Sequence, residues 1–325
     1  MKVCIGYQSA LEYWRIRRAL PDDRAMQRRN IALPNTIPTA KQVRSSGLSL
    51  PLHTILRDPD YRWRTKIITQ HILSGKLPAG CFFTAKNELE VSSPEFCFLQ
   101  MAGSLSLPGL IELGYELCGK YSLPVAAPIT SDVKLPERGF FNRPPLTNVK
   151  KISAFIASMP GFKGQKKAVR ALRYILEGSA SPMETKLSVL LTLPYQLGGF
   201  GFLKPELNAR VTPKKSDRGT TDKEFYICDL FWPDKEVAVE YDSNQFHTGS
   251  AHIADDSKKR NALKAMGIGV ITITTQQIYD KNELALAARV IAKSLGKRLV
   301  YKNPGFAAAH NELRGILHIE SDWPQ

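Results

Sequence analysis

The last third of the chain is predicted to form an α/β domain, because strand-like and helix-like segments alternate there. Three segments rich in β-branched and aromatic residues are typical of strands: 225–231, 237–241 and 270–274. Two helical segments, each followed by glycine, cover 255–266 and 282–295. A further helix starts at Ser181, a capping residue followed by proline and an acidic residue. This order predicts a mixed central sheet flanked by helices.

The rest of the chain differs in character, and a length of 325 residues predicts more than one domain. A second helix start of the same style stands at Ser93-Pro94-Glu95. Short helices beside a β-hairpin predict a small mixed α+β domain, with a winged helix as the candidate architecture. The predicted division is a mixed domain over 1–123, a basic linker and helix over 124–178, the α/β domain over 179–300 and a polar tail over 301–325.

The chain carries a strong excess of positive charge, with 45 Lys and Arg residues against 30 Asp and Glu residues and a formal net charge of +15. This balance favours a polyanionic partner, nucleic acid before an anionic membrane surface. A basic surface without a specialised partner stays open as the alternative. Because no run reaches about 18 apolar residues and no apolar leader begins the chain, we expect neither a membrane span nor a signal peptide. The five cysteines, mostly among apolar neighbours, are typical of reduced thiols in a cytoplasmic protein.

One segment, 138–176, contains no acidic residue, while its basic residues are Arg138, Arg143, Lys150, Lys151, Lys163, Lys166, Lys167, Arg170 and Arg173. We interpret it as a candidate nucleic-acid-binding surface that faces phosphate. The expected contacts on its helix are Lys163, Lys166, Lys167 and Arg170. The alternative is a solvated helix face that lacks acids.

Acidic residues lie within or at the end of predicted strands that are otherwise apolar. Asp229 lies within the first predicted strand, and Glu240 and Asp242 lie two residues apart at the end of the second. Burying such charges is costly unless a cation lies among them. Hydrolysis of a phosphodiester needs an activated water and a shield for negative charge, which Mg²⁺ or Mn²⁺ supplies through oxygen ligands. We therefore predict a metal site; the alternative is exposed strand ends paired with Lys or Arg.

Two more residues are candidates for proton transfer. His247 follows the second strand, and a histidine near a phosphate can act as general acid or base because its pKa is near neutral pH. Glu184 lies in the first turn of the helix that starts at Ser181, where the helix dipole favours an acid in any case.

The segments 228–234, 237–242 and 246–247, with the helix over 255–267 and the strand after it, resemble the very-short-patch-repair (Vsr)-like endonucleases of the PD-(D/E)xK group. The resemblance implies a restriction-endonuclease-like fold, a metal bound by Asp229 with Glu240 or Asp242, and catalytic roles for Glu184 and His247. This sequence has Asp242 where the ExK pattern has lysine, and Ser243 where glycine is common. Further phosphate contacts are expected on the helix, from Lys259 and Arg260; the alternative is that these side chains form surface ion pairs.

The first region is similar to AbiEi-type winged-helix regulators through Ser9-Ala10-Leu11 and Ser93-Pro94-Glu95, which implies DNA docking. Two function classes follow: a metal-dependent DNA endonuclease, in which every site residue has a use, and a DNA-binding regulator or antitoxin-like protein that no longer cuts. An RNA nuclease stays open as a third. We expect no small-molecule cofactor and no membrane partner.

Overall fold

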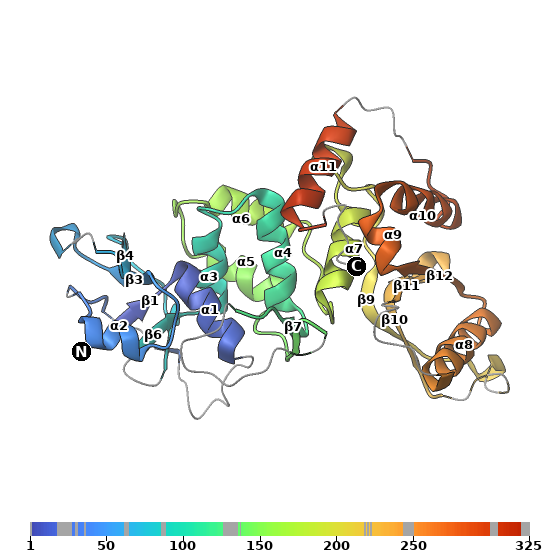
Figure 1. Cartoon of the computed structure of the whole chain (residues 1–325), viewed down its shortest axis with the longest axis horizontal. Helices are drawn as coiled ribbons and strands as arrows, with labels where there is room; N and C mark the ends of the chain where they lie inside the picture. The colour runs from blue at the N-terminus through green and yellow to red at the C-terminus, as the bar shows by residue number, and fades with distance from the viewer. Residues whose placement is uncertain are drawn as a thin grey trace. The chain divides into compact units, whose positions relative to one another are not determined.

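The computed structural model describes residues 2–17, 28–29, 32–35, 37–61, 65–85, 89–125, 136, 138–217, 219, 221, 223–242, 250–299 and 305–319. The chain forms two compact units, Met1–Ile175 and Leu176–Gln325. Each unit combines helices with a sheet, which confirms the α/β class (Figure 1). No helix in the described part of the chain has both the length and the apolar character needed to cross a membrane.

The first unit is built on a six-stranded mixed sheet with the order β2-β5-β6-β1-β3-β4. Its strands are β1 (Val3–Ile5), β2 (Arg28–Arg29), β3 (Leu52–Leu56), β4 (Ile68–Ile72), β5 (Phe82–Thr84) and β6 (Leu89–Ser92). β1 pairs parallel with β6, so that Val3 lies beside Leu89, and antiparallel with β3. The β-hairpin that we expected over 1–123 is therefore only part of a wider sheet, because β1 pairs with strands far along the chain.

Four helices of this unit pack around a fifth that is buried along its whole length. The helices of the unit are α1 (Tyr7–Arg17), α2 (Ala40–Ser45), α3 (Pro94–Met101), α4 (Leu107–Cys118), α5 (Val149–Ala157) and α6 (Gln165–Leu172). α3 is apolar on most sides, and α1, α4, α5 and α6 all pack against it. The hydroxyl of Ser93 accepts a hydrogen bond from the N–H of Phe96 at 3.2 Å, which confirms the predicted start of this helix.

The segment 138–175 belongs to the first unit, so the predicted division at residue 123 and the predicted linker over 124–178 are wrong. α5 buries Ile152, Phe155 and Ile156 against the other helices. Ile175, which follows α6, packs tightly against α4. A Cβ added to Gly114 on α4 would lie 2.2 Å from Ile175 Cδ1, so there is no room for a side chain at Gly114. Most basic residues of this segment are exposed, but Arg143 is buried and therefore does not face phosphate as predicted, and Lys167 is half-buried.

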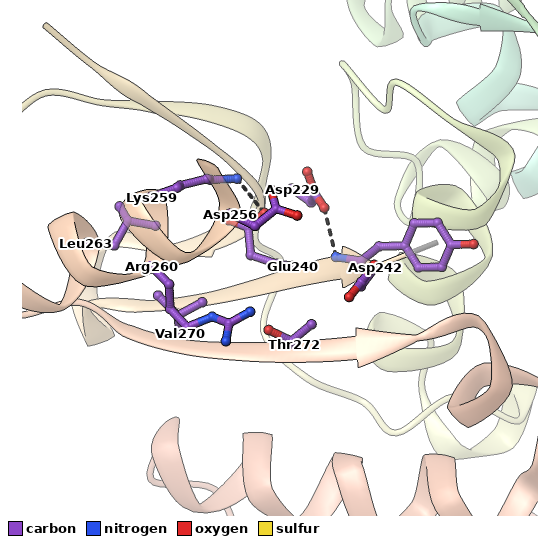
Figure 2. Close-up of a pocket in the computed structure, with 10 residues that line it drawn as sticks. Asp229, Glu240, Asp242, Asp256, Lys259, Arg260, Leu263, Val270 and Thr272 are labelled. Atoms are coloured by element: carbon purple, nitrogen blue, oxygen red, sulfur yellow. Dashed lines mark hydrogen bonds and ion pairs between the residues drawn. The ribbon is translucent and has the colours of Figure 1, made fainter. Parts of the chain in front are cut away.

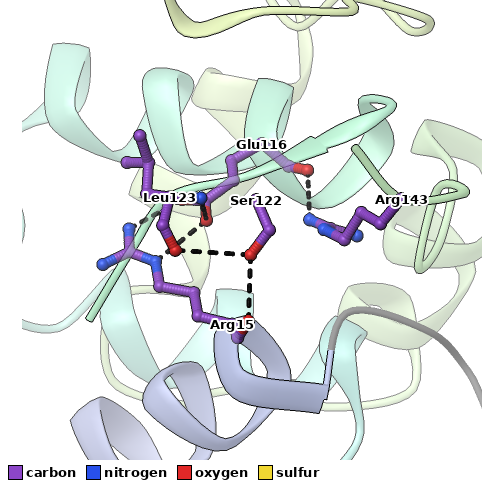
Figure 3. A network of polar contacts seen from close by, with 5 residues as sticks. All are labelled: Arg15, Glu116, Ser122, Leu123 and Arg143. Carbon is purple, nitrogen blue, oxygen red and sulfur yellow. Dashed lines mark hydrogen bonds and ion pairs between the residues drawn. The ribbon is translucent and has the colours of Figure 1, made fainter. Parts of the chain in front are cut away.

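A buried polar network joins α1 to α4 and to the chain that follows (Figure 3). The carboxylate of Glu116, 2% exposed, accepts two hydrogen bonds from the Arg15 guanidinium, at 2.9 and 2.6 Å. The backbone carbonyl of Glu116 accepts another from Arg143 at 2.5 Å. Ser122 donates to the Arg15 carbonyl at 3.2 Å. The short strands β7 (Tyr121–Ser122) and β8 (Phe141–Asn142) pair beside this network.

The second unit has a four-stranded sheet with the order β12-β11-β10-β9. Its elements are α7 (Pro182–Thr192), β9 (Glu206–Val211), β10 (Tyr226–Trp232), β11 (Val237–Asp242), α8 (Ser250–Ala265), β12 (Gly269–Thr274), α9 (Thr275–Tyr279), α10 (Lys281–Ser294) and α11 (Phe306–Ile316). β10 is antiparallel to β9 and β11, and β12 is parallel to β11. These elements confirm the predicted helices and strands and add β9, which the sequence analysis missed.

The segment predicted as a polar tail over 301–325 contains α11 and belongs to the second unit, which corrects the division at residue 300. This helix packs on the turn at Tyr195–Leu197, and the buried ring of His310 contacts the carbonyl of Gly198 at 2.6 Å. All five cysteines are free and buried, as expected for core thiols.

Candidate active site

A cavity of about 190 Å³ opens between α8 and the strands β10, β11 and β12 (Figure 2). Its lining comprises Asp229, Glu240, Tyr241, Asp242, Asp256, Lys259, Arg260, Leu263, Val270 and Thr272. α8 is held against the sheet by Ala262 and Leu263, which pack with Cys228 and Ala238 in one core cluster. The structure thus brings together the three predicted strand carboxylates and the two basic residues predicted on the helix.

Asp229 is held by the neighbouring strand. Its Oδ2 accepts a hydrogen bond from the backbone N–H of Tyr241 on β11, at 2.8 Å. Burial raises the pKa of Asp229 above its usual value, while this hydrogen bond and the charge of Lys259 act in the opposite direction. Asp229 is therefore a carboxylate that the fold fixes in place in an environment poor in water.

Glu240 forms an ion pair with Lys259, whose Nζ lies 2.6 Å from Oε2. The other oxygen, Oε1, is buried and accepts no hydrogen bond from any residue in the described part of the chain. Burial, followed by the charge of Asp229, raises the pKa of Glu240 to about 7. Burial opposes the charged form of Lys259, but Glu240 raises the pKa of this ammonium above its usual value. The pair therefore holds two half-buried opposite charges and, among the described residues, one buried oxygen without a hydrogen-bond partner.

Glu184 approaches the same group of acids from α7. The N–H of Glu184 is capped by Ser181 Oγ at 3.1 Å, which confirms the predicted helix start. Its Oε2 accepts hydrogen bonds from the N–H of Ala180 at 2.9 Å and from Asn208 Nδ2 at 2.6 Å. Burial and then the charge of Asp229 raise the pKa of Glu184 to about 6. A carboxyl group with this pKa can give up or take a proton near neutral pH.

Asn208 is a site residue that the sequence analysis missed. It lies on β9 with a backbone φ of +48°, in the left-handed region that non-glycine residues seldom adopt. Its side chain donates to Glu184 Oε2 and, at 3.2 Å, to the carbonyl of Gly178. Asparagine tolerates this conformation better than most residues. Because β9 was not predicted, nothing in the sequence placed Asn208 beside Glu184.

No family model, no curated protein and no solved structure matches this chain. The resemblance noted from the sequence therefore stays a prediction, and the site is interpreted from its own residues.

The residues fit a divalent cation that prefers oxygen ligands. Asp229 and Glu240 stand on adjacent strands, and the buried Oε1 of Glu240 is an acceptor for which the described residues provide no donor. Among the residues that the structure describes, no three His, Cys, Asp or Glu side chains form a closed metal-binding group. Mg²⁺ is commonly held by one or two carboxylates, with water and phosphate completing its shell, so a pair of acids is sufficient.

The other predicted site residues lie elsewhere. His247 falls outside the described residues. In the first unit, Lys163, Lys166 and Arg170 are exposed at α6, and Lys167 donates to the carbonyl of Leu105 at 2.6 Å. These four side chains belong to a different unit from the cavity, so their predicted contact with nucleic acid stays a prediction.

Proposed function

We propose that this chain is a metal-dependent DNA endonuclease whose active site is the cavity at Asp229 and Glu240. One observation carries the proposal: two half-buried carboxylates lie side by side on neighbouring strands, and Oε1 of Glu240 is a buried atom with no hydrogen-bond partner among the described residues. Such an arrangement is costly for the fold by itself. Carboxylates with raised pKa values in a cavity are typical of functional sites.

Asp229 and Glu240 are the residues that would hold Mg²⁺ or Mn²⁺. When bound, this ion supplies an activated water and neutralises charge on the phosphate. Glu184, with a pKa of about 6, is suited to move a proton beside this pair, and Asn208 fixes its orientation. Arg260, which lines the same cavity, is suited to contact a phosphate oxygen.

Two features support a nucleic acid substrate. The net charge of +15 favours a polyanion, and the exposed basic residues of α6 offer a second place for phosphate contacts. The sequence resembles restriction-endonuclease-like cores in its predicted order of helix, strand, strand, helix, strand and helix, and the structure of the second unit has this order with β9 added before the first predicted strand. We assign this unit to that fold as part of the proposal.

Cleavage of supercoiled plasmid with Mg²⁺ or Mn²⁺ tests the proposal, with Asp229→Asn as the disabled variant. Asp234→Asn is the matched control, because Asp234 lies in an exposed turn of the same unit. We expect the wild type and the control to cut and Asp229→Asn to lose cutting by at least about 100-fold. A wild type that shifts duplex DNA but never cuts it would instead support the DNA-binding regulator. Cutting confined to RNA in a substrate panel would support the RNA nuclease.

A further inference from the structure

The position of Lys259 gives the site a cation of its own. We propose that Lys259 is a resident counter-ion that competes with the divalent metal for Glu240 and is released when the metal binds. This inference rests on the proposed metal site at Asp229 and Glu240. It assigns to Lys259 a positioning role in addition to the phosphate contact expected from the sequence.

The contact is short and fixed by the fold. Lys259 Nζ lies 2.6 Å from Glu240 Oε2, and its side chain is only 27% exposed. Lys259 stands one helical turn before the buried Leu263, so the same face of α8 that packs on the sheet directs the ammonium to β11 (Figure 2). A surface lysine would sample many rotamers, whereas this one is anchored at its target.

Lys259 and a divalent cation would both neutralise the negative charge of Asp229 and Glu240. The carboxylates of Asp229 and Glu240 repel each other, and the ammonium reduces that repulsion in the chain without metal. A divalent ion between the same carboxylates would repel the ammonium. The two cations therefore exclude each other at Glu240, and loading of the metal requires the ion pair to open.

A phosphate group would resolve this competition. Once displaced from Glu240, the ammonium needs a new anionic partner, and a phosphate oxygen beside the metal is one. Binding of metal and binding of substrate would then favour each other, because each removes the partner that held the other back. The site would bind metal weakly without nucleic acid and more tightly with it.

Metal affinity tests the inference without reference to cutting. Mn²⁺ binding at pH 8, measured by electron paramagnetic resonance of the free ion, is compared in wild type, Lys259→Met and Lys259→Arg. Lys264→Met is the matched control, since Lys264 is an exposed residue of the same helix. We expect Lys259→Met to bind Mn²⁺ on the order of tenfold more tightly, the size of one charge-assisted contact. The other two variants are expected to match the wild type.

A second readout uses the unaltered chain and so does not depend on a variant that folds. Acetylation of lysine side chains, followed by mass spectrometry, should modify Lys259 faster when Mn²⁺ is saturating, while Lys264 reacts at the same rate with and without the ion. Unchanged affinity in Lys259→Met, or an unchanged rate at Lys259, would overturn the role of Lys259 alone. If Asp229→Asn binds Mn²⁺ as tightly as the wild type does, the metal site is overturned and, with it, this inference.

Discussion

Replacing Glu184 by glutamine should stabilise the protein at alkaline pH. The folded state raises the pKa of this carboxyl from 4.5 to about 6, so it holds the proton more tightly than the unfolded state does. Stability is then highest below pH 4.5 and is lost as the pH rises through about 6. At about 1.4 kcal/mol for each pH unit, the ionised carboxylate costs about 2 kcal/mol at pH 8 and less than about half of that at pH 5. Glutamine removes this cost and still offers an oxygen to the Ala180 and Asn208 donors.

Thermal unfolding of wild type and Glu184→Gln at pH 5 and pH 8, with divalent ions chelated, measures the effect. We expect the Tm of the second unit to rise by roughly 4 to 8 °C at pH 8 and by much less at pH 5. Glu312→Gln is the control, because Glu312 is exposed on α11 of the same unit. A Tm that falls, or one that rises equally at both pH values, would show that neither burial nor Asp229 disfavours the charged form of Glu184.

Three further predictions concern the first unit. Glu116→Ala leaves the half-buried guanidinium of Arg15 without its buried carboxylate partner, so urea unfolding should show a loss of roughly 3 kcal/mol, and a loss below about 1 kcal/mol would contradict it. Gly114→Ala places a methyl group 2.2 Å from Ile175 Cδ1 and should cost about 1 to 3 kcal/mol, part of which Ile175→Val restores; additive effects in the double variant would argue against this contact. Lys166→Gln should lower the slope of log affinity for duplex DNA against log salt by about 1, measured by fluorescence anisotropy, and an unchanged slope would remove α6 from the interface.

The strands that line the site could be predicted because their sequences are mostly apolar and rich in β-branched or aromatic residues. β10, β11 and β12 are almost continuous apolar runs, and such runs are recognisable in a sequence. β9 could not be predicted, because Glu206–Val211 is a short segment in which buried residues alternate with polar or exposed ones, and it also contains Asn208. Helix starts at Ser93 and Ser181 were predictable because a cap depends only on residues within one turn.

The contacts of the site were less predictable than its residues. Asp229, Glu240 and Asp242 were expected at one place because two adjacent strands carry them. The ion pair between Lys259 and Glu240 joins residues that come together only when α8 folds back onto the sheet, and neither local pattern nor charge specifies that approach. The wrong division at residue 123 has a similar cause, since α5 and α6 join the first unit through tertiary packing of a few apolar side chains.

The pairing of β1 inside the sheet of the first unit governs the order in which this unit can form. A ribosome that has released β1 must still synthesise the chain as far as β6 before Val3 meets Leu89. At a rate of roughly 5 to 20 residues per second, the edge of β1 that faces β6 remains unpaired for several seconds, even once β3 is available to pair with the other edge. Topologies with such distant pairing fold slowly, because the loop must close before its contacts form. A nascent chain stalled before residue 89 would present an open strand edge to other proteins, and chaperones that shield such edges would be needed during that interval.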